Sequence, residues 1–141
     1  MSGFDEALFE MYLKEVPMFT ACSPDELDAL AGLASPRAVD AGTNLVEEGT
    51  EGDEFFVIML GAATVTRSGK EIATLEAGDF FGELALFDPA PRNATVTARE
   101  PCTTAVLQRD SFQWALDASP TFRDALLRGM ARRIHNLDAK V

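Results

Sequence analysis

The sequence predicts a mainly β member of the α+β class: an antiparallel β-roll or jelly roll with N-terminal helices and C-terminal helices packed on it. Apolar residues recur at helical spacing near both ends of the chain, and the middle consists of short runs rich in Val, Ile, Phe and Thr that glycines separate. No helical period interrupts these runs before Phe81, which argues against a doubly wound parallel sheet. The 141 residues fit one domain, with N-terminal helices over 1–35, the roll over 36–108 and C-terminal helices over 110–138.

Two helices are expected in the N-terminal part. Residues 7–15 carry apolar side chains at helical spacing, and Pro17 ends or interrupts this helix. A second helix follows Ser23, which would be its N-cap. Pro24 would occupy the first helical position, and Glu26 would complete a capping box.

The strands of the roll are expected to be short. Strands that recur every ~8–12 residues with turn residues between them are typical of a sandwich or a rolled barrel. The glycines between the runs supply the positive φ angles that tight turns need. The expected strands span residues 44–47, 54–60, 63–67, 71–75, 95–98 and 103–108.

Helices return after Arg109. Asp110 or Ser111 is expected to cap the first of them, and Ser119 followed by Pro120 restarts a helix that continues to residue 138. The apolar residues of this last helix fall on one broad stripe, with arginines over the rest of its surface. We expect the aromatic residues to belong to the core and not to a stacking platform: Trp114 on the first of these helices, and Phe55, Phe56, Phe80 and Phe81 in the roll.

The charge of the chain is uneven. The formal net charge is −11; residues 1–54 hold 13 acidic and 2 basic residues, whereas residues 119–141 hold 2 acidic and 5 basic residues. Such an acidic chain lacks the clustered Lys and Arg that nucleic-acid binding requires. The basic tail is either a solvated face or a surface that meets an anion or an acidic partner.

Several classes of protein are excluded. No apolar run approaches the ~20 residues of a membrane-spanning helix, and the N-terminus lacks the basic region of a signal peptide, so we expect no membrane partner. Cys22 and Cys102 lack the spacing of a metal site, and we expect them to be reduced, as in a cytoplasmic protein. His135 is the only histidine, which leaves no material for a histidine metal site or a Ser-His-Asp triad. We therefore expect no catalysis, no metal and no cofactor.

The chemistry of the sequence is concentrated in residues 78–96. A short helix-forming run follows Gly82, and the N-terminus of such a helix presents free backbone N–H groups that suit an anion. Arg92 follows Glu83 by nine residues. A guanidinium binds phosphate oxygens in a bidentate manner, and a carboxylate accepts hydrogen bonds from sugar hydroxyls. This combination suits a sugar phosphate.

The same segment resembles the phosphate-binding cassette of the cyclic nucleotide-binding domain family, which includes protein kinase A regulatory subunits, cyclic nucleotide-gated channels and the catabolite activator protein. The resemblance rests on residues 81–86 and 91–96, so that the cassette spans 81–96. Residues 52–61 resemble the β-roll core of the family, and residues 109–112 resemble the start of the helix that follows the roll. About residues 23–137 are covered by the resemblance.

The resemblance implies a ligand site. Arg92 would pair with the cyclic phosphate, and Glu83 would accept the ribose 2′-hydroxyl. Asn93 stands where the family usually has Ala, Ser or Thr; it either touches the ligand, which leaves the choice of purine open, or points at solvent. The backbone N–H groups expected to complete the site are those of Gly82, Leu84, Ala85 and Ala94. In this family the last helix swings over the base, and the candidate lid residues here are Met130, Arg132, Arg133 and Ile134. The alternative for the apolar residues Met130 and Ile134 is that they belong to the core.

The sequence therefore predicts a regulatory cyclic nucleotide-binding module that binds cAMP and signals to an effector protein when the last helix closes. One alternative is a cGMP-binding module. The other is the sensor part of a Crp/Fnr-type transcription regulator, which would have to be truncated because no room for a helix-turn-helix follows the last helix. We expect no nucleic-acid partner for this chain alone. A homodimer stays open, because the last helix lacks sustained heptads. Met1 and the helical N-terminus fit a stand-alone protein.

Overall fold

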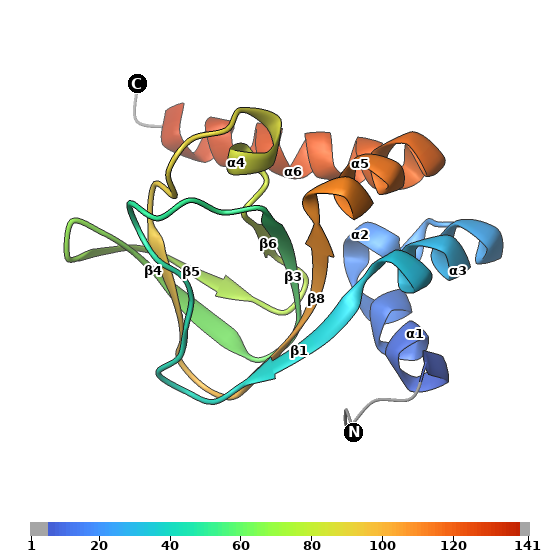
Figure 1. The fold of residues 1–141 in the computed structure, drawn as a ribbon, viewed down its shortest axis with the longest axis horizontal. Helices are drawn as coiled ribbons and strands as arrows, with labels where there is room; N and C mark the ends of the chain where they lie inside the picture. The colour runs from blue at the N-terminus through green and yellow to red at the C-terminus, as the bar shows by residue number, and fades with distance from the viewer. Residues whose placement is uncertain (1–5, 139–141) are drawn as a thin grey trace.

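Two antiparallel sheets form the body of the protein, and helices from the N-terminal and C-terminal parts of the chain pack on it (Figure 1). The computed structural model describes residues 6–138. The strand orders are β1-β8-β3-β6 and β2-β7-β4-β5, which confirms the predicted antiparallel β-roll with flanking helices. The elements are α1 (Glu6–Glu15), α2 (Pro17–Thr20), α3 (Pro24–Leu33), β1 (Ser35–Val39), β2 (Asn44–Val46), β3 (Glu54–Leu60), β4 (Ala62–Arg67), β5 (Lys70–Glu76), β6 (Phe80–Phe81), α4 (Leu84–Phe87), β7 (Thr95–Ala98), β8 (Cys102–Gln108), α5 (Arg109–Ala118) and α6 (Pro120–Asp138).

The start of α3 has the predicted capping box. The Ser23 hydroxyl accepts a hydrogen bond from the N–H of Glu26 (3.1 Å), and the Glu26 carboxylate accepts one from the N–H of Ser23 (3.0 Å). Two of the orphan donors at the helix N-terminus are thereby satisfied. Pro17 ends α1, as expected, and also begins the short helix α2, which the sequence pattern did not predict.

Strand β3 is buried on both faces and divides the interior into two cores. Successive side chains of a strand point to opposite faces, so Phe55 and Val57 pack with the helices while Phe56 and Ile58 pack between the two sheets. The four predicted core phenylalanines, which include Phe80 and Phe81, are buried.

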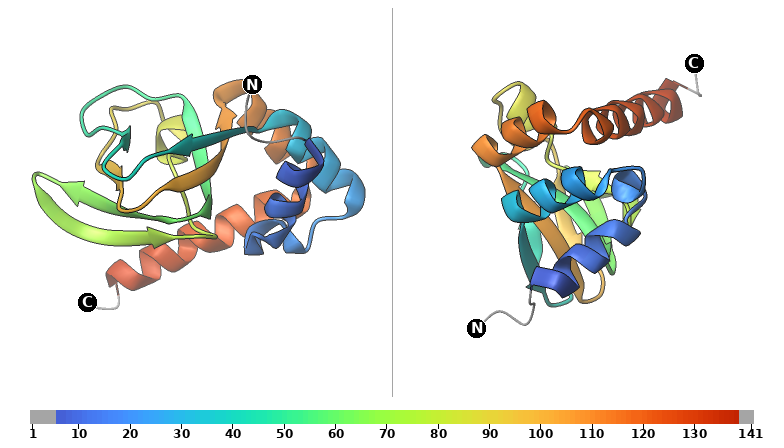
Figure 2. Two further views of the ribbon diagram at one scale, coloured as in Figure 1. Left: turned by 90° about the horizontal axis from the view of Figure 1, so that it is seen from below. Right: turned by 90° about the vertical axis from the view of Figure 1, so that its right-hand side faces the viewer.

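The C-terminal helices lie against the roll beside the N-terminal helices. Helix α6 begins next to them and runs back across the molecule to its opposite end (Figure 2). Phe122 and Leu126 are fully buried, and at Gly129 the helix passes close to the Phe80 ring of the roll. A Cβ at Gly129 would lie 2.4 Å from the Phe80 ring, so only glycine fits this approach.

Three local predictions were wrong. The N-cap of α5 is Gln108 and not Asp110 or Ser111, since the helix begins directly where β8 ends. Trp114 is 68% exposed, because the buried stripe of α5 runs through Phe112, Ala115 and Leu116 on the other side of the helix. Strands β1 and β6 were not predicted. Strand β1 begins with a Ser-Pro pair, which is compatible with its place at the edge of its sheet, and β6 has only two residues.

Candidate functional site

The polar residues of the predicted cassette lie where β6 leads into α4. Gly82 has φ +94°, and a Cβ there would lie 2.6 Å from the carbonyl oxygen of Glu54, which explains the glycine. The first hydrogen bonds of α4 run from the N–H groups of Leu86 and Phe87 to the carbonyl of Glu83. The N–H groups before them, those of Leu84 and Ala85 among them, have no acceptor within the helix and are available to an anion.

Arg92 is a buried cation at this helix end. Its side chain donates hydrogen bonds to the carbonyl of Gly82 (Nη1, 3.1 Å) and to the carbonyl of Glu54 (Nη2, 2.8 Å). The residue is 8% exposed, and it forms no ion pair with any residue from 6 to 138. The Glu54 carboxylate points elsewhere, since it pairs with Arg37 at 2.6 Å. Burial lowers the pKa of Arg92, although the nearby carboxylates of Glu54, Asp53 and Glu83 act against this shift.

The loop 49–52 holds Arg92 in place. The N–H of Arg92 donates to the carbonyl of Thr50 (2.7 Å), and its carbonyl accepts from the N–H of Gly49 (2.8 Å). At Gly52 an added Cβ would lie 2.0 Å from Nε of Arg92. The absence of a side chain at Gly52 therefore provides the space in which the guanidinium lies.

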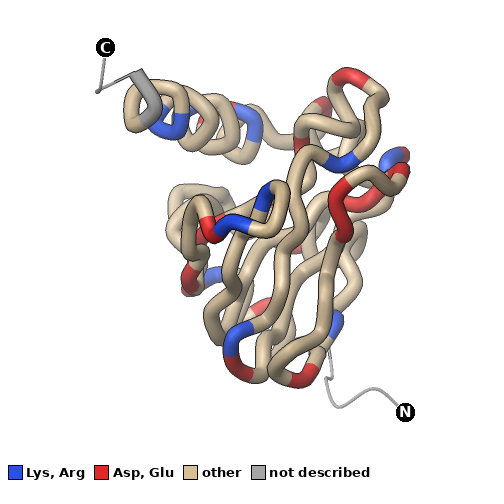
Figure 3. The backbone as a smooth tube through the Cα atoms, turned by 90° about the vertical axis from the view of Figure 1, so that its left-hand side faces the viewer, with Lys and Arg blue, Asp and Glu red and all other residues tan. Residues whose placement is uncertain are grey.

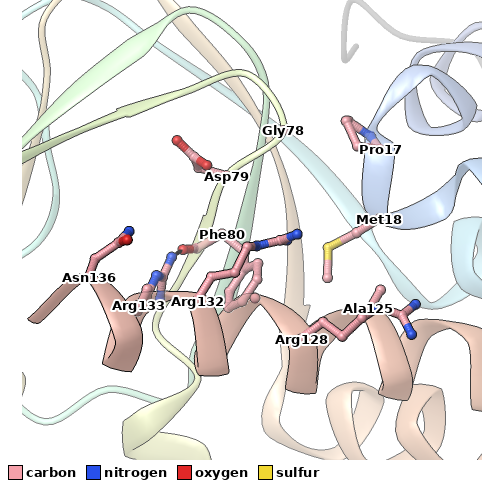
Figure 4. Close-up of a pocket in the computed structure, with 11 residues that line it drawn as sticks. Pro17, Met18, Gly78, Asp79, Phe80, Ala125, Arg128, Arg132, Arg133 and Asn136 are labelled. Carbon is pink, nitrogen blue, oxygen red and sulfur yellow. Dashed lines mark hydrogen bonds between the residues drawn. The ribbon is translucent and has the colours of Figure 1, made fainter. Parts of the chain in front are cut away.

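Glu83 is tied to the last helix. Its carboxylate is 4% exposed and accepts a hydrogen bond from Nη1 of Arg133 at 3.0 Å. Arg133 also donates from Nη2 to the carbonyl of Phe80, and its guanidinium lies 4.4 Å from the centre of the Phe80 ring (Figure 4). One arginine of α6 therefore contacts both the cassette carboxylate and the strand that precedes it.

Two further cassette residues directly follow Arg92 in the chain. Asn93 is exposed, and its backbone carbonyl accepts a hydrogen bond from Nε of Arg67 on β4 (2.9 Å). Ala94 is buried directly before β7. Arg67 therefore fixes the backbone on the side of Arg92 that faces β7, while the Asn93 side chain remains turned to the surface.

The four predicted lid residues lie in different surroundings. Arg133 reaches the cassette, as described above. Met130 packs against the core between the helices and the sheet, Ile134 is 56% exposed, and Arg132 lines a cleft between α6 and α2. In this arrangement only Arg133 of the four contacts the cassette residue predicted to bind the ribose.

Four residues of the site were not singled out individually by the sequence: Gly52, Glu54, Arg67 and Phe80. Gly52 and Glu54 fall in the run that resembles the β-roll core of the family, which was a usable signal. Arg67 acts through a contact with the Asn93 carbonyl, and Phe80 acts through its carbonyl and its ring, which both contact Arg133. Contacts between residues so far apart in the chain leave no pattern in a sequence.

The described residues show no metal site and no membrane helix. Among residues 6–138, no group of three His, Cys, Asp or Glu side chains is arranged to hold a metal ion. No helix in this part of the chain has the length and apolar character needed to cross a membrane. Cys22 and Cys102 are both free thiols.

Known proteins are similar to this chain in sequence and fold. The family model described as "Cyclic nucleotide-binding domain" matches residues 36–119. A cAMP-dependent protein kinase regulatory subunit of Yarrowia lipolytica is 39% identical over 109 residues, which are 76% of this chain and 29% of the relative. The chain thus spans less than a third of the length of this curated relative.

The solved structures agree with this match. A structure described as "Sp-2Cl-cAMPS bound to PKAR CBD2" has a TM-score of 0.81 at 31% identity, covering 95% of this chain and 90% of the other. The catabolite activator protein of Thermus thermophilus has a TM-score of 0.78 at 26% identity, covering 88% of this chain and 61% of the other. With the family model matching more than half of its residues, the chain belongs to the cyclic nucleotide-binding domain family.

Proposed function

We propose that this chain is a regulatory module that binds cAMP. The observation that carries the proposal is Arg92, a buried guanidinium without an ion-pair partner among residues 6–138, next to unbonded N–H groups at the start of α4. A buried cation is costly unless an anion compensates it. A small anionic ligand would supply that compensation, and two of the three similar proteins described above are named for cAMP or for a cAMP analogue.

The phosphate and the ribose of the nucleotide would each have a partner in the site. The guanidinium of Arg92 has five N–H donors, of which the two described hydrogen bonds use two, so donors remain for the cyclic phosphate. The N–H groups of Gly82, Leu84, Ala85 and Ala94 would complete the phosphate site. Glu83 would accept the ribose 2′-hydroxyl, as carboxylates do in other nucleotide sites.

The Glu83–Arg133 pair would couple the ligand to α6. A carboxylate has about four lone-pair sites, so Glu83 can accept the ribose hydroxyl and keep Arg133 at the same time. A nucleotide would then bind more tightly when α6 lies against the cassette than when it has moved away. This differential affinity is what a ligand needs in order to shift the helix toward the closed state.

The signal would pass to an effector protein. The curated relatives are regulatory subunits of a kinase, which favours a regulatory and not a catalytic role for this chain and makes a protein kinase the first class of effector to test. The cytoplasmic location expected from the sequence remains a prediction.

A thermal-shift experiment tests the ligand. The whole chain is melted alone and with cAMP, cGMP, cyclic di-GMP or 5′-AMP at equal concentration. A ligand at 100 times its dissociation constant should stabilise the folded state by ~2.7 kcal/mol. The proposal expects the largest rise in melting temperature with cAMP. A larger rise with cGMP would correct the choice of purine, and no rise with either nucleotide would overturn the proposed function.

A further inference from the structure

The outer face of α5 carries an exposed tryptophan between carboxylates. Asp110, Gln113, Trp114 and Asp117 are spaced like neighbours on one helix face, and all four are exposed. Trp114 is the only tryptophan of the chain and the most exposed of its large apolar side chains among residues 6–138. The Trp114 side chain is therefore accessible to a partner molecule.

A basic cleft lies on another side of the molecule, between α6 and α2 (Figure 4). Its volume is about 350 Å³. Met18 and Phe80 provide apolar walls, and the α6 residues Arg128 and Arg132, one helical turn apart, provide positive charge. These two arginines are exposed and form no hydrogen bond or ion pair with any described residue (6–138). Lys and Arg positions along α6 are visible in Figure 3.

With its remaining charged groups included, the cleft keeps a net positive charge. Arg133 also lines it but is paired with Glu83. Asp79 opposes an anion, although one of its carboxylate oxygens already accepts the N–H of Glu76 at 2.8 Å. The cleft thus offers two unpaired guanidiniums beside an apolar wall, which is the chemistry that an aromatic side chain flanked by carboxylates complements.

We propose that this cleft receives Trp114 of a second copy of the chain, with the flanking carboxylates Asp110 and Asp117 facing Arg128 and Arg132. The indole would pack between the apolar walls, where Arg guanidiniums also stack favourably on aromatic faces. Tryptophan and arginine are the residues most enriched among those that dominate binding energy at interfaces. The acidic α5 face and the basic α6 cleft therefore carry opposite charges.

The contact joins two different surfaces of the same molecule. Each copy carries both, so the association closes as a reciprocal dimer or continues from copy to copy. Two chains of net charge −11 repel each other at long range. At physiological salt, charges farther apart than ~8 Å are screened, whereas the directly paired groups still interact. The association is accordingly expected at that ionic strength.

Complementary variants test the proposal. Trp114→Ala keeps the cleft and lacks the tryptophan; the double variant Arg128→Glu with Arg132→Glu keeps the tryptophan and lacks the basic cleft. We expect the mass of the wild-type chain in sedimentation equilibrium to rise with concentration, and each variant to associate at least tenfold more weakly. A mixture of the two variants should form a heterodimer of twice the 15.3 kDa chain mass, because each supplies what the other lacks.

Fluorescence identifies the contact in that mixture. Trp114 of the double variant is the only tryptophan present, so a blue shift and weaker quenching by acrylamide report its entry into the cleft of the partner. The matched control is Arg99→Glu with Arg123→Glu, which changes the same charge at exposed positions outside the cleft and should associate like the wild type. Circular dichroism verifies that every variant is folded. A wild-type chain that stays monomeric at millimolar concentration, a Trp114→Ala chain that associates normally, or a mixture that stays monomeric would each overturn the proposal.

Discussion

Substituting Gly52 by Ala should weaken nucleotide binding while the fold survives. Gly52 has no positive φ angle, so an alanine can adopt its backbone conformation. The new Cβ, however, would lie 2.0 Å from Nε of Arg92 and 2.3 Å from its Cζ. The end of a long side chain can move away from such a contact, and the guanidinium would therefore leave its position beside the cassette.

The size of the effect follows from this geometry. Ordinary contact begins near 3.4 Å, so Arg92 must shift by about 1.4 Å. Such a shift breaks the alignment of at least one hydrogen bond between the guanidinium and a bound phosphate. A hydrogen bond to a charged group contributes about 1.5–3 kcal/mol, which corresponds to a dissociation constant about 10- to 150-fold higher.

Isothermal titration calorimetry with cAMP measures this loss directly. The matched control is Gly32→Ala, because Gly32 lies in α3 with no atom within 4 Å of an added Cβ. That variant should bind cAMP like the wild type and gain about 0.5–1 kcal/mol of stability from its better helix propensity. A folded Gly52→Ala chain with an unchanged dissociation constant would refute the role assigned to Arg92.

Further predictions concern α6 and Ser119, the residue directly before it. Arg133→Met should lower the free energy of unfolding by about 1–2 kcal/mol, because Glu83 keeps a buried carboxylate that only solvent can then satisfy; an unchanged urea midpoint would contradict this. Gly129→Ala should lower the melting temperature, since overpacking against Phe80 costs about 1–3 kcal/mol; a rise would show that α6 does not lie where the structure has it. The Glu26 carboxylate accepts hydrogen bonds from the Ser119 hydroxyl, the Ser23 N–H and the Thr121 hydroxyl, and such bonds lower its pKa to about 2 from 4.5. The stability that Glu26 contributes relative to Glu26→Gln should thus be complete above pH 4.5 and disappear as the pH falls toward 2. Thermal melts of both chains across pH 2–7 check this, and a difference that does not shrink in acid would count against the pairing.

Patterns with a local cause were predictable from the sequence. The capping box of α3 needs only Ser23 and Glu26 at fixed spacing, and both hydrogen bonds are present. The short runs rich in Val, Ile, Phe and Thr, separated by glycines, predicted the roll. Strand β6 could not be predicted, because Phe80 and Phe81 pair with a strand distant in sequence and have no period of their own.

The positions of Trp114 and Arg133 depend on how the helices α5 and α6 are oriented against the roll. Trp114 lies two positions from both Phe112 and Leu116, which is about 200° around a helix from each, so strict periodicity would have placed it outside. Arg133 continues the buried stripe of Phe122, Leu126 and Gly129, and an arginine on an inward face was the available signal for its contact with Glu83. Which of the α6 arginines reached the cassette still depended on how far along the roll α6 docks, and tertiary packing sets that position.

Removing the buried cation itself is the most direct test of the ligand site. Calorimetric titrations of cAMP into the wild-type chain and into Arg92→Ala are compared at the same salt concentration, with circular dichroism confirming that both are folded. One cAMP per wild-type chain is expected. Losing two or more charged hydrogen bonds should raise the dissociation constant of the variant at least about 100-fold. Equal affinity in the two chains would contradict the assignment of Arg92 as the phosphate-binding residue.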